Sequence, residues 1–97
     1  MFLAILHYKL PAEEVSKHRQ AHRDYLESCY QKKQLIVSGP MVPTTGGLIL
    51  FRVNKREEVD RIIEQDPFHK NGVADYQVIE FDAVKSDPEF REIFLAE

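Results

Sequence analysis

Two histidines four residues apart, His18 and His22, lie in the middle of a stretch that has the apolar spacing of an amphipathic helix. At about 100° per residue, His22 falls near the centre of one helical arc, between Val15 and Leu26. We therefore expect the imidazole of His22 to face the protein interior, where it needs a hydrogen-bond partner. His18 lies on the same arc, and we interpret it as a surface or cleft-rim residue.

Asp66 is the candidate partner of His22. It ends a second amphipathic segment, residues 55–66, and a helix continued at the same pitch would turn Asp66 to the apolar side of that segment. An imidazole that is hydrogen-bonded to a carboxylate has a fixed tautomer and can accept and release a proton near neutral pH. The alternative is that His22 is a satisfied core histidine and that Asp66 only caps the turn at residues 66–68. The residues alone leave both interpretations open.

Other chemistry is less well supported by the spacing. Two histidines at i and i+4 can place two nitrogens on one metal ion, but a catalytic zinc site needs a third protein ligand. No spacing pattern joins His7 or His69 to the pair, so we expect no metal and no cofactor. Cys29 lies one turn beyond Leu26 on the buried arc, and we interpret it as a core residue rather than a nucleophile. Arg19 is either a solvated helix charge or a clamp for a substrate carboxylate, and both interpretations stay open.

Length and charge limit the class of protein. Ninety-seven residues predict one domain over residues 1–97. A net charge of −3 without a cluster of Lys and Arg argues against a nucleic-acid partner and favours a small neutral or anionic ligand. No apolar run reaches the roughly eighteen residues of a membrane span, so we expect no membrane association. A single cysteine excludes an internal disulfide, which is typical of a reducing compartment, and we expect a cytoplasmic location.

The hydrophobic pattern predicts six main elements and a tail. The expected strands cover residues 2–8, 35–39, 48–53 and 76–84, and the expected helices cover residues 11–33 and 55–66. The first strand is continuously apolar, as in a central strand, whereas the last strand alternates like an edge strand. A short terminal helix is expected over residues 86–97, with Ser86 or Asp87 as its cap. The order predicts an α+β, ferredoxin-like βαββαβ fold, in which both helices cover one face of a four-stranded antiparallel sheet.

The other face of that sheet needs a cover. Two helices shield only one face, yet the strand at residues 2–8 is apolar in both registers. The economical cover is the same face of a second copy, since two-fold pairing is the commonest assembly. We therefore predict a homodimer that packs through its sheet faces, with the terminal tail contributing to the contact.

Four short motifs occur in order along nearly the full chain: Arg19-x-x-His22-x-x-Tyr25-Leu26, Ser38-Gly39-Pro40, Asp66-Pro67-Phe68 and Gly72-Val73. In order and spacing they resemble the YciI-like (YCII-related) family. The resemblance implies a dimeric α/β-barrel with a cleft in which His22 and Asp66 form a catalytic pair. The cleft-wall residues that it implies are Arg19, Ser38, Gly39, Pro40 and Phe68. The chain departs from the family pattern in a short loop, PTTGG, which lies just after the Ser38-Gly39-Pro40 motif. This loop leaves the width of the cleft mouth open.

Together these features predict a small, cofactor-independent enzyme. His22, oriented by Asp66, would move a proton during isomerisation, elimination or hydrolysis of a small organic molecule. The resemblance adds the dehydrochlorinase type, because some relatives remove chloride from chlorinated aromatic breakdown products. The alternative is a non-catalytic dimer that binds a small molecule or has a regulatory role.

Overall fold

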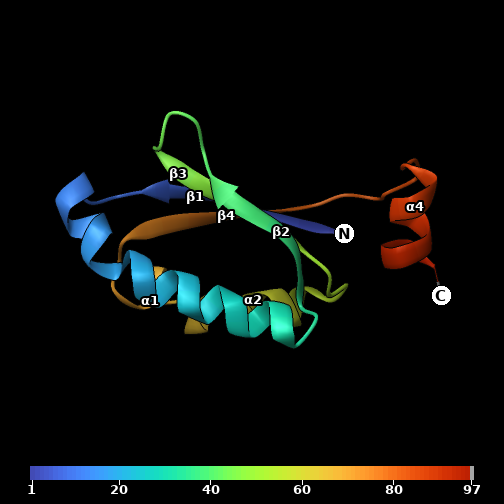
Figure 1. The fold of residues 1–97 in the computed structure, drawn as a ribbon, viewed down its shortest axis with the longest axis horizontal. Helices are drawn as coiled ribbons and strands as arrows, with labels where there is room; N and C mark the ends of the chain where they lie inside the picture. The colour runs from blue at the N-terminus through green and yellow to red at the C-terminus, as the bar shows by residue number, and fades with distance from the viewer. Residues whose placement is uncertain (97) are drawn as a thin grey trace.

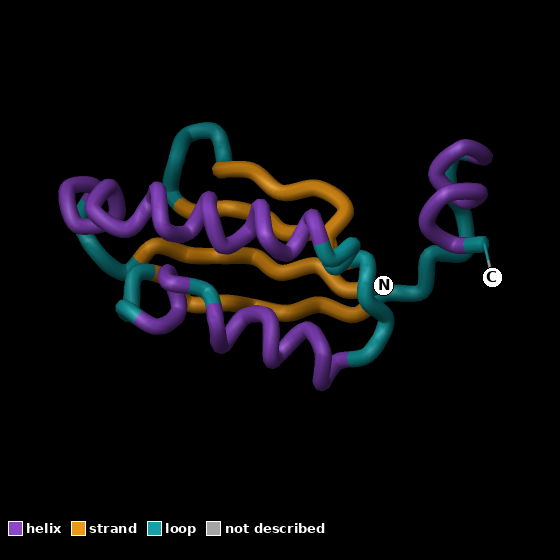
Figure 2. The backbone as a smooth tube through the Cα atoms, turned by 60° about the horizontal axis from the view of Figure 1, so that its bottom comes forward, coloured by secondary structure: helices purple, strands orange, loops and turns teal. Residues whose placement is uncertain are grey.

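One four-stranded sheet carries both main helices on a single face (Figures 1 and 2). The computed structural model describes residues 1–96. Its strands are β1 (Phe2–Tyr8), β2 (Leu35–Pro40), β3 (Gly46–Phe51) and β4 (Ala74–Glu80), and its main helices are α1 (Ala12–Gln31) and α2 (Arg56–Gln65). The strand order is β2-β3-β1-β4, and each neighbouring pair is antiparallel. The predicted ferredoxin-like fold is confirmed, with β1 inside the sheet and β4 at its edge. Within the described residues, no helix combines the length and the apolar character that a bilayer crossing requires.

The strands end where their partner strands end. The last strand was predicted over residues 76–84, but β4 stops at Glu80, which pairs with Phe2, the first residue of β1. Likewise β3 stops at Phe51, which pairs with Leu35, the first residue of β2. The predicted antiparallel pairing of these two strands is confirmed. The loop between them is shorter than the predicted residues 40–47, because β3 already begins at residue 46, where it pairs with β1.

Helix α1 ends two residues earlier than predicted, at Gln31. Lys33 has a φ of 59°, which is the left-handed conformation that terminates helices. The N–H of Lys33 donates to the carbonyl of Tyr30 at 2.9 Å, and the N–H of Gln34 donates to the carbonyl of Cys29 at 3.0 Å. These two bonds form a Schellman motif, which satisfies the last carbonyl groups of α1.

The second helix is interrupted at Asp66. The second helix was predicted over residues 55–66 with Pro67 as its stop, but α2 ends one residue earlier, at Gln65, and a separate short helix that was not predicted, α3 (Pro67–Lys70), follows. Asp66 between them is extended, with a ψ of 127°. The physical reason is Pro67, whose ring disfavours the helical conformation of the preceding residue.

The two faces of the sheet differ in burial. Alternate residues of β1 face the helices and are buried, namely Phe2, Ala4 and Leu6. On the opposite face, the strand register aligns Val37, Leu50, Leu3 and Ile79 in one apolar row across all four strands. Val37 is 56% exposed and Ile79 is 38% exposed. We call this surface the outer sheet face.

The tail forms two short helical turns after an irregular stretch at residues 81–87. A turn of α-helix, α4 (Pro88–Phe90), continues into a π-helical turn, η1 (Arg91–Leu95). Asp87 is the cap, because its side chain accepts a hydrogen bond from the N–H of Glu89 at 2.9 Å. The last residue of the predicted helix, Glu97, lies outside the described residues. Figure 1 shows the tail at one end of the molecule, apart from the two main helices.

Candidate functional site

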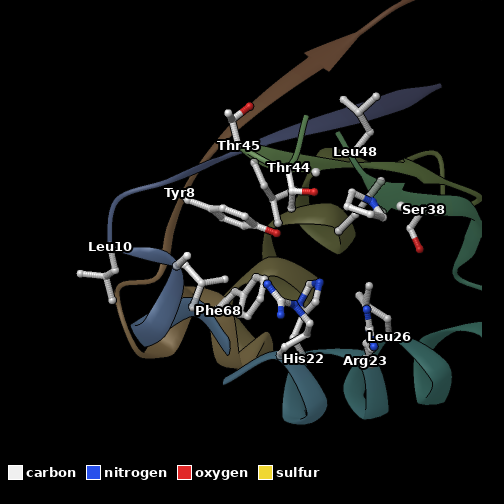
Figure 3. Close-up of a pocket in the computed structure, with 18 residues that line it drawn as sticks. Tyr8, Leu10, His22, Arg23, Leu26, Ser38, Thr44, Thr45, Leu48 and Phe68 are labelled. Carbon is white, nitrogen blue, oxygen red and sulfur yellow. The ribbon is translucent and has the colours of Figure 1, made fainter. Parts of the chain in front are cut away.

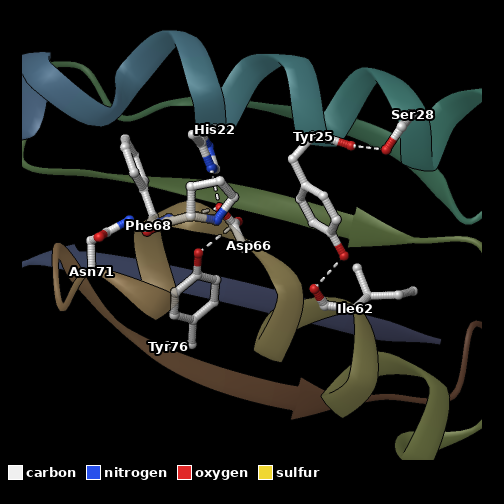
Figure 4. A network of polar contacts seen from close by, with 9 residues as sticks. His22, Tyr25, Ser28, Ile62, Asp66, Phe68, Asn71 and Tyr76 are labelled. Carbon is white, nitrogen blue, oxygen red and sulfur yellow. Dashed lines mark hydrogen bonds and ion pairs between the residues drawn. The ribbon is translucent and has the colours of Figure 1, made fainter.

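His22 on α1 and Asp66 at the end of α2 meet between the two helices (Figure 4). The His22 Nδ1 atom lies 2.7 Å from the Asp66 Oδ1 atom. Asp66 is 1% exposed, and the side chain of His22 is 13% exposed. The same Asp66 oxygen accepts a hydrogen bond from the N–H of Phe68 at 3.0 Å and so caps α3. The two roles considered from the sequence, cap of the turn at residues 66–68 and partner of His22, are therefore combined in one carboxylate.

A tyrosine on α1 links the two helices beside this pair. The hydroxyl of Tyr25 donates to the carbonyl of Ile62 at 2.6 Å (Figure 4). That carbonyl is available because the chain turns at Asp66, whose N–H donates to the carbonyl of Ile63 instead. The turn therefore directs the carboxylate inward and also frees a backbone acceptor that ties α2 to α1.

Tyr76 on β4 completes the surroundings of the carboxylate. Its hydroxyl donates to the Asp66 Oδ2 atom at 2.7 Å, so Asp66 accepts three hydrogen bonds in all. Burial raises the pKa of Tyr76, and the charge of Asp66 and the hydrogen bond to it raise this pKa further. Tyr76 therefore stays a neutral donor across the physiological pH range. Within the described residues, no buried side-chain nitrogen or oxygen lacks a partner.

The hydrogen bond to Asp66 also sets the tautomer of His22. An ionised carboxylate can only accept, so Nδ1 of His22 carries the proton and donates it. The Nε2 atom of the neutral ring is then an acceptor, and within residues 1–96 no group hydrogen-bonds to it. The imidazole also stacks on the ring of Phe68, with centroids 3.9 Å apart and planes 2° apart. These two contacts fix the position and the plane of the ring.

A pocket opens beside His22, between α1 and the β2–β3 side of the sheet (Figure 3). Its volume of about 730 Å³ is large enough for a small organic molecule. The lining residues besides His22 are mainly apolar, including Leu6, Leu26 and Ile49, with hydroxyl groups from Tyr8 and Thr44 among them. In Figure 3 the Tyr8 hydroxyl and the His22 ring project toward each other from opposite walls. The pocket therefore offers an apolar space with a proton acceptor on one side.

The structure places the predicted wall residues around this pocket. Arg19, Ser38, Gly39, Pro40 and Phe68 all line it, together with His22. The hydroxyl of Ser38 lies 2.7 Å from the hydroxyl of Tyr30, a contact that orients the Ser38 side chain. Asp66 does not line the pocket, because it lies behind the imidazole.

Three residues of the site escaped the sequence analysis. Arg23 lines the pocket, and its position four residues after Arg19 on one helix is a signal that could have identified it. Tyr8 lines the pocket from the end of β1 and packs edge-on against the Phe68 ring, with centroids 5.9 Å apart. Tyr76 reaches Asp66 from the edge strand β4, which follows α3 in the chain, and no local pattern in the sequence indicates this contact.

The remaining candidates lie outside the pocket. His7 and His69 are exposed and His18 is half-buried, and none of them lines it. Cys29 is buried, which raises the pKa of its thiol, so its interpretation as a core residue agrees with its environment. Among the residues that the structure describes, no group of three His, Cys, Asp or Glu side chains could hold a metal ion.

Fold and site together define a ferredoxin-like α+β domain in which a histidine at the edge of a pocket is hydrogen-bonded to a buried aspartate. The YCII-related domain matches residues 1–82, and the chain belongs to this family, as the sequence resemblance predicted. A similar solved structure is 5-chloro-2-hydroxyhydroquinone dehydrochlorinase (TftG) from Burkholderia phenoliruptrix AC1100, in complex with 2,5-dihydroxybenzoquinone. The TM-score is 0.68 and the identity is 24%, over 84% of this chain and 94% of that chain, a likeness that shows the shared fold. A comparison with curated proteins finds no match.

Proposed function

We propose that this protein is a small, cofactor-independent enzyme in which His22 moves a proton to or from a small organic molecule. The observation that carries the proposal is the 2.7 Å hydrogen bond between His22 Nδ1 and Asp66. It leaves Nε2 as the free acceptor on an imidazole that lines the pocket. After Nε2 accepts a proton, the buried carboxylate stabilises the imidazolium ring, and Tyr76 and the Phe68 N–H hold that carboxylate in place.

Elimination of chloride is the reaction type that we favour. It is the activity named for the structurally similar dehydrochlorinase, whose fold this chain shares. In such a step, Nε2 of His22 takes a proton from the substrate, and the electron pair of the broken bond forms a new π bond. In an aromatic substrate such as 5-chloro-2-hydroxyhydroquinone, this proton comes from a ring hydroxyl of the keto tautomer, in which the chlorine-bearing carbon also carries a hydrogen. The O–H electron pair forms a C=O bond, the conjugated π bond shifts, and chloride leaves with its bonding electrons. The imidazolium later releases its proton to water. The step needs no oxidant, reductant or cofactor.

The test of this function is chloride release from 5-chloro-2-hydroxyhydroquinone. We expect turnover by the unmodified protein and a loss of about 10²- to 10⁴-fold in kcat for His22→Gln, because a positioned acid–base group contributes that range. His18→Gln is the matched control, since His18 lies one turn away on α1 and does not line the pocket. Its kcat should stay within about two-fold of the unmodified protein.

Binding separates the enzyme from the non-catalytic alternative. His22→Gln should still bind 2,5-dihydroxybenzoquinone, because the remaining pocket wall is unchanged. Equal chloride release by His22→Gln and the unmodified protein would refute the role of His22. Binding without any turnover by the unmodified protein would instead favour a dimer that only binds or senses its ligand.

The outer sheet face supports a homodimer as the working form of this enzyme. One row of this face, formed by Val37, Leu50, Leu3 and Ile79, is apolar, and the chain's own helices lie on the other face. An uncharged row that crosses all four strands contains no like charges that would oppose packing against the same row of a second copy, as in a two-fold contact. The exposed apolar side chains of the tail, such as Ile93 at 59%, extend the surface available to a second copy.

Sedimentation tests the dimer directly. We expect the unmodified protein to sediment as a dimer at micromolar concentration and Ile79→Lys to sediment as a monomer, because a lysine there would bury a charge in the interface. Val42→Lys is the control, since Val42 is 97% exposed in the loop between β2 and β3. A monomeric unmodified protein, or a dimer that survives Ile79→Lys, would contradict this interface.

A further inference from the structure

We infer that the pocket selects an organic anion and that Arg23, together with Arg19, holds the anionic group. This inference names the substrate class of the proposed enzyme and therefore rests on that proposal. Its basis is a concentration of positive charge in one concave site, next to the imidazole that would do the chemistry.

The two arginines are neighbours on the surface of α1. Residues four apart on a helix project from the same side, one turn from each other, and both arginines line the pocket. His22 lies between them in sequence and lines the same pocket. An anionic group held by this pair would therefore place the rest of a small molecule within reach of Nε2 of His22.

Among residues 1–96, no carboxylate of the pocket lining balances the charge of this pair. The pocket lining contains no Asp or Glu, and the nearby Asp66 lies behind the imidazole with three hydrogen bonds already made. Within residues 1–96, neither Arg19 nor Arg23 forms an ion pair or a side-chain hydrogen bond, whereas Arg56 pairs with an aspartate. The chain as a whole carries a net charge of −3, so the positive charge at this pocket is opposite in sign to the net charge of the protein. A guanidinium pair without a protein partner is suited to a carboxylate or phenolate oxygen.

The rest of the lining describes the body of the ligand. Apolar side chains, including Leu6, Leu26 and Ile49, form much of the wall, and Tyr8 adds a hydroxyl opposite His22 (Figure 3). Such a wall favours a compact ring over a long polar chain. The substrate class is therefore a small cyclic or aromatic anion, with its charged oxygen at the arginines and its reacting atom at His22.

Two pairs of probes test the charge preference by calorimetric titration. Benzoate and benzamide share one shape and differ in charge. In the second pair, 4-nitrophenolate is the anion and nitrobenzene is the neutral probe. We expect at least one anion to bind about ten-fold more tightly than its neutral partner, because the arginine contact is charge-assisted. Arg23→Gln should remove most of that preference and leave the affinity for the neutral probe unchanged. The control is Arg61→Gln, because Arg61 is exposed on α2 and is not part of the wall of the pocket beside His22.

The outcomes separate this inference from the proposed function. Equal affinity for charged and neutral probes in both pairs, or no binding of either anion at millimolar concentration, would overturn the inference. A loss in Arg23→Gln no larger than that in Arg61→Gln would overturn the role of Arg23. An anion preference that persists in His22→Gln would support the inference independently of turnover, whereas turnover without any anion preference would support only the proposed function.

Discussion

Replacement of Asp66 by alanine is expected to lower the free energy of unfolding by about 3–5 kcal/mol. The carboxylate accepts hydrogen bonds from His22 Nδ1, the Tyr76 hydroxyl and the Phe68 N–H, and it is 1% exposed. Its removal leaves three donors without their partner and takes away the cap of α3. Because a lost cap alone costs about 1 kcal/mol, the buried donors account for most of the effect.

Two companion variants make this result interpretable. Tyr76→Phe removes one of the three donors and should cost about 1 kcal/mol. Asp60→Ala removes a half-exposed aspartate of α2, whose ion pair with Arg56 should contribute about 0.5 kcal/mol or less. Equilibrium unfolding in urea measures all three variants. Equal destabilisation by Asp66→Ala and Asp60→Ala would show that the buried network does not stabilise the fold.

Gly46→Ala should destabilise the protein by about 3 kcal/mol or more. Gly46 is the first residue of β3 and pairs with His7 of β1. A Cβ atom at this position would overlap the backbone carbonyl of Leu6, and a backbone atom within a sheet cannot move aside as a side chain can. The expected result is a separation of β3 from β1 at the end of the sheet that lines the pocket.

Gly39→Ala is the matched control for that prediction. Gly39 is also a strand glycine near the pocket, but a Cβ atom there would meet nothing within 4 Å. Its substitution should change the stability by about 0.5 kcal/mol at most. Thermal unfolding followed by circular dichroism compares the two variants, and similar midpoints would contradict the close approach of β3 to β1.

The fold could be predicted because local patterns report the type of each element. A continuous apolar run identified β1, and helical spacing identified α1, so the order of elements followed. The ends of elements depend on distant partners and were therefore less accurate. The alternating residues of β4 do not indicate that the strand ends at Glu80. It ends there because its partner strand β1 begins at Phe2, the residue that pairs with Glu80.

The part of the site that could be predicted is the part whose orientation follows from the pitch of a helix. His22 faces inward as its place on α1 predicts, but Asp66 faces inward for a different reason, namely the extended conformation before Pro67. Tyr76 joins the network from another layer of the fold, so its role depends on tertiary structure alone. Arg23 shares a helix with Arg19, but only the position of the β2–β3 side of the sheet makes it a pocket residue.

The double use of Asp66 has a consequence for engineering this scaffold. A carboxylate that both terminates one helix and begins another cannot be exchanged to retune reactivity without disturbing the chain path around it. The imidazole of His22 is different, because it belongs to a residue inside an uninterrupted helix, and the backbone of that helix does not need this side chain as a cap. New chemistry is therefore better introduced at position 22 and along the neighbouring turns of that helix, with the aspartate retained as a fixed anchor.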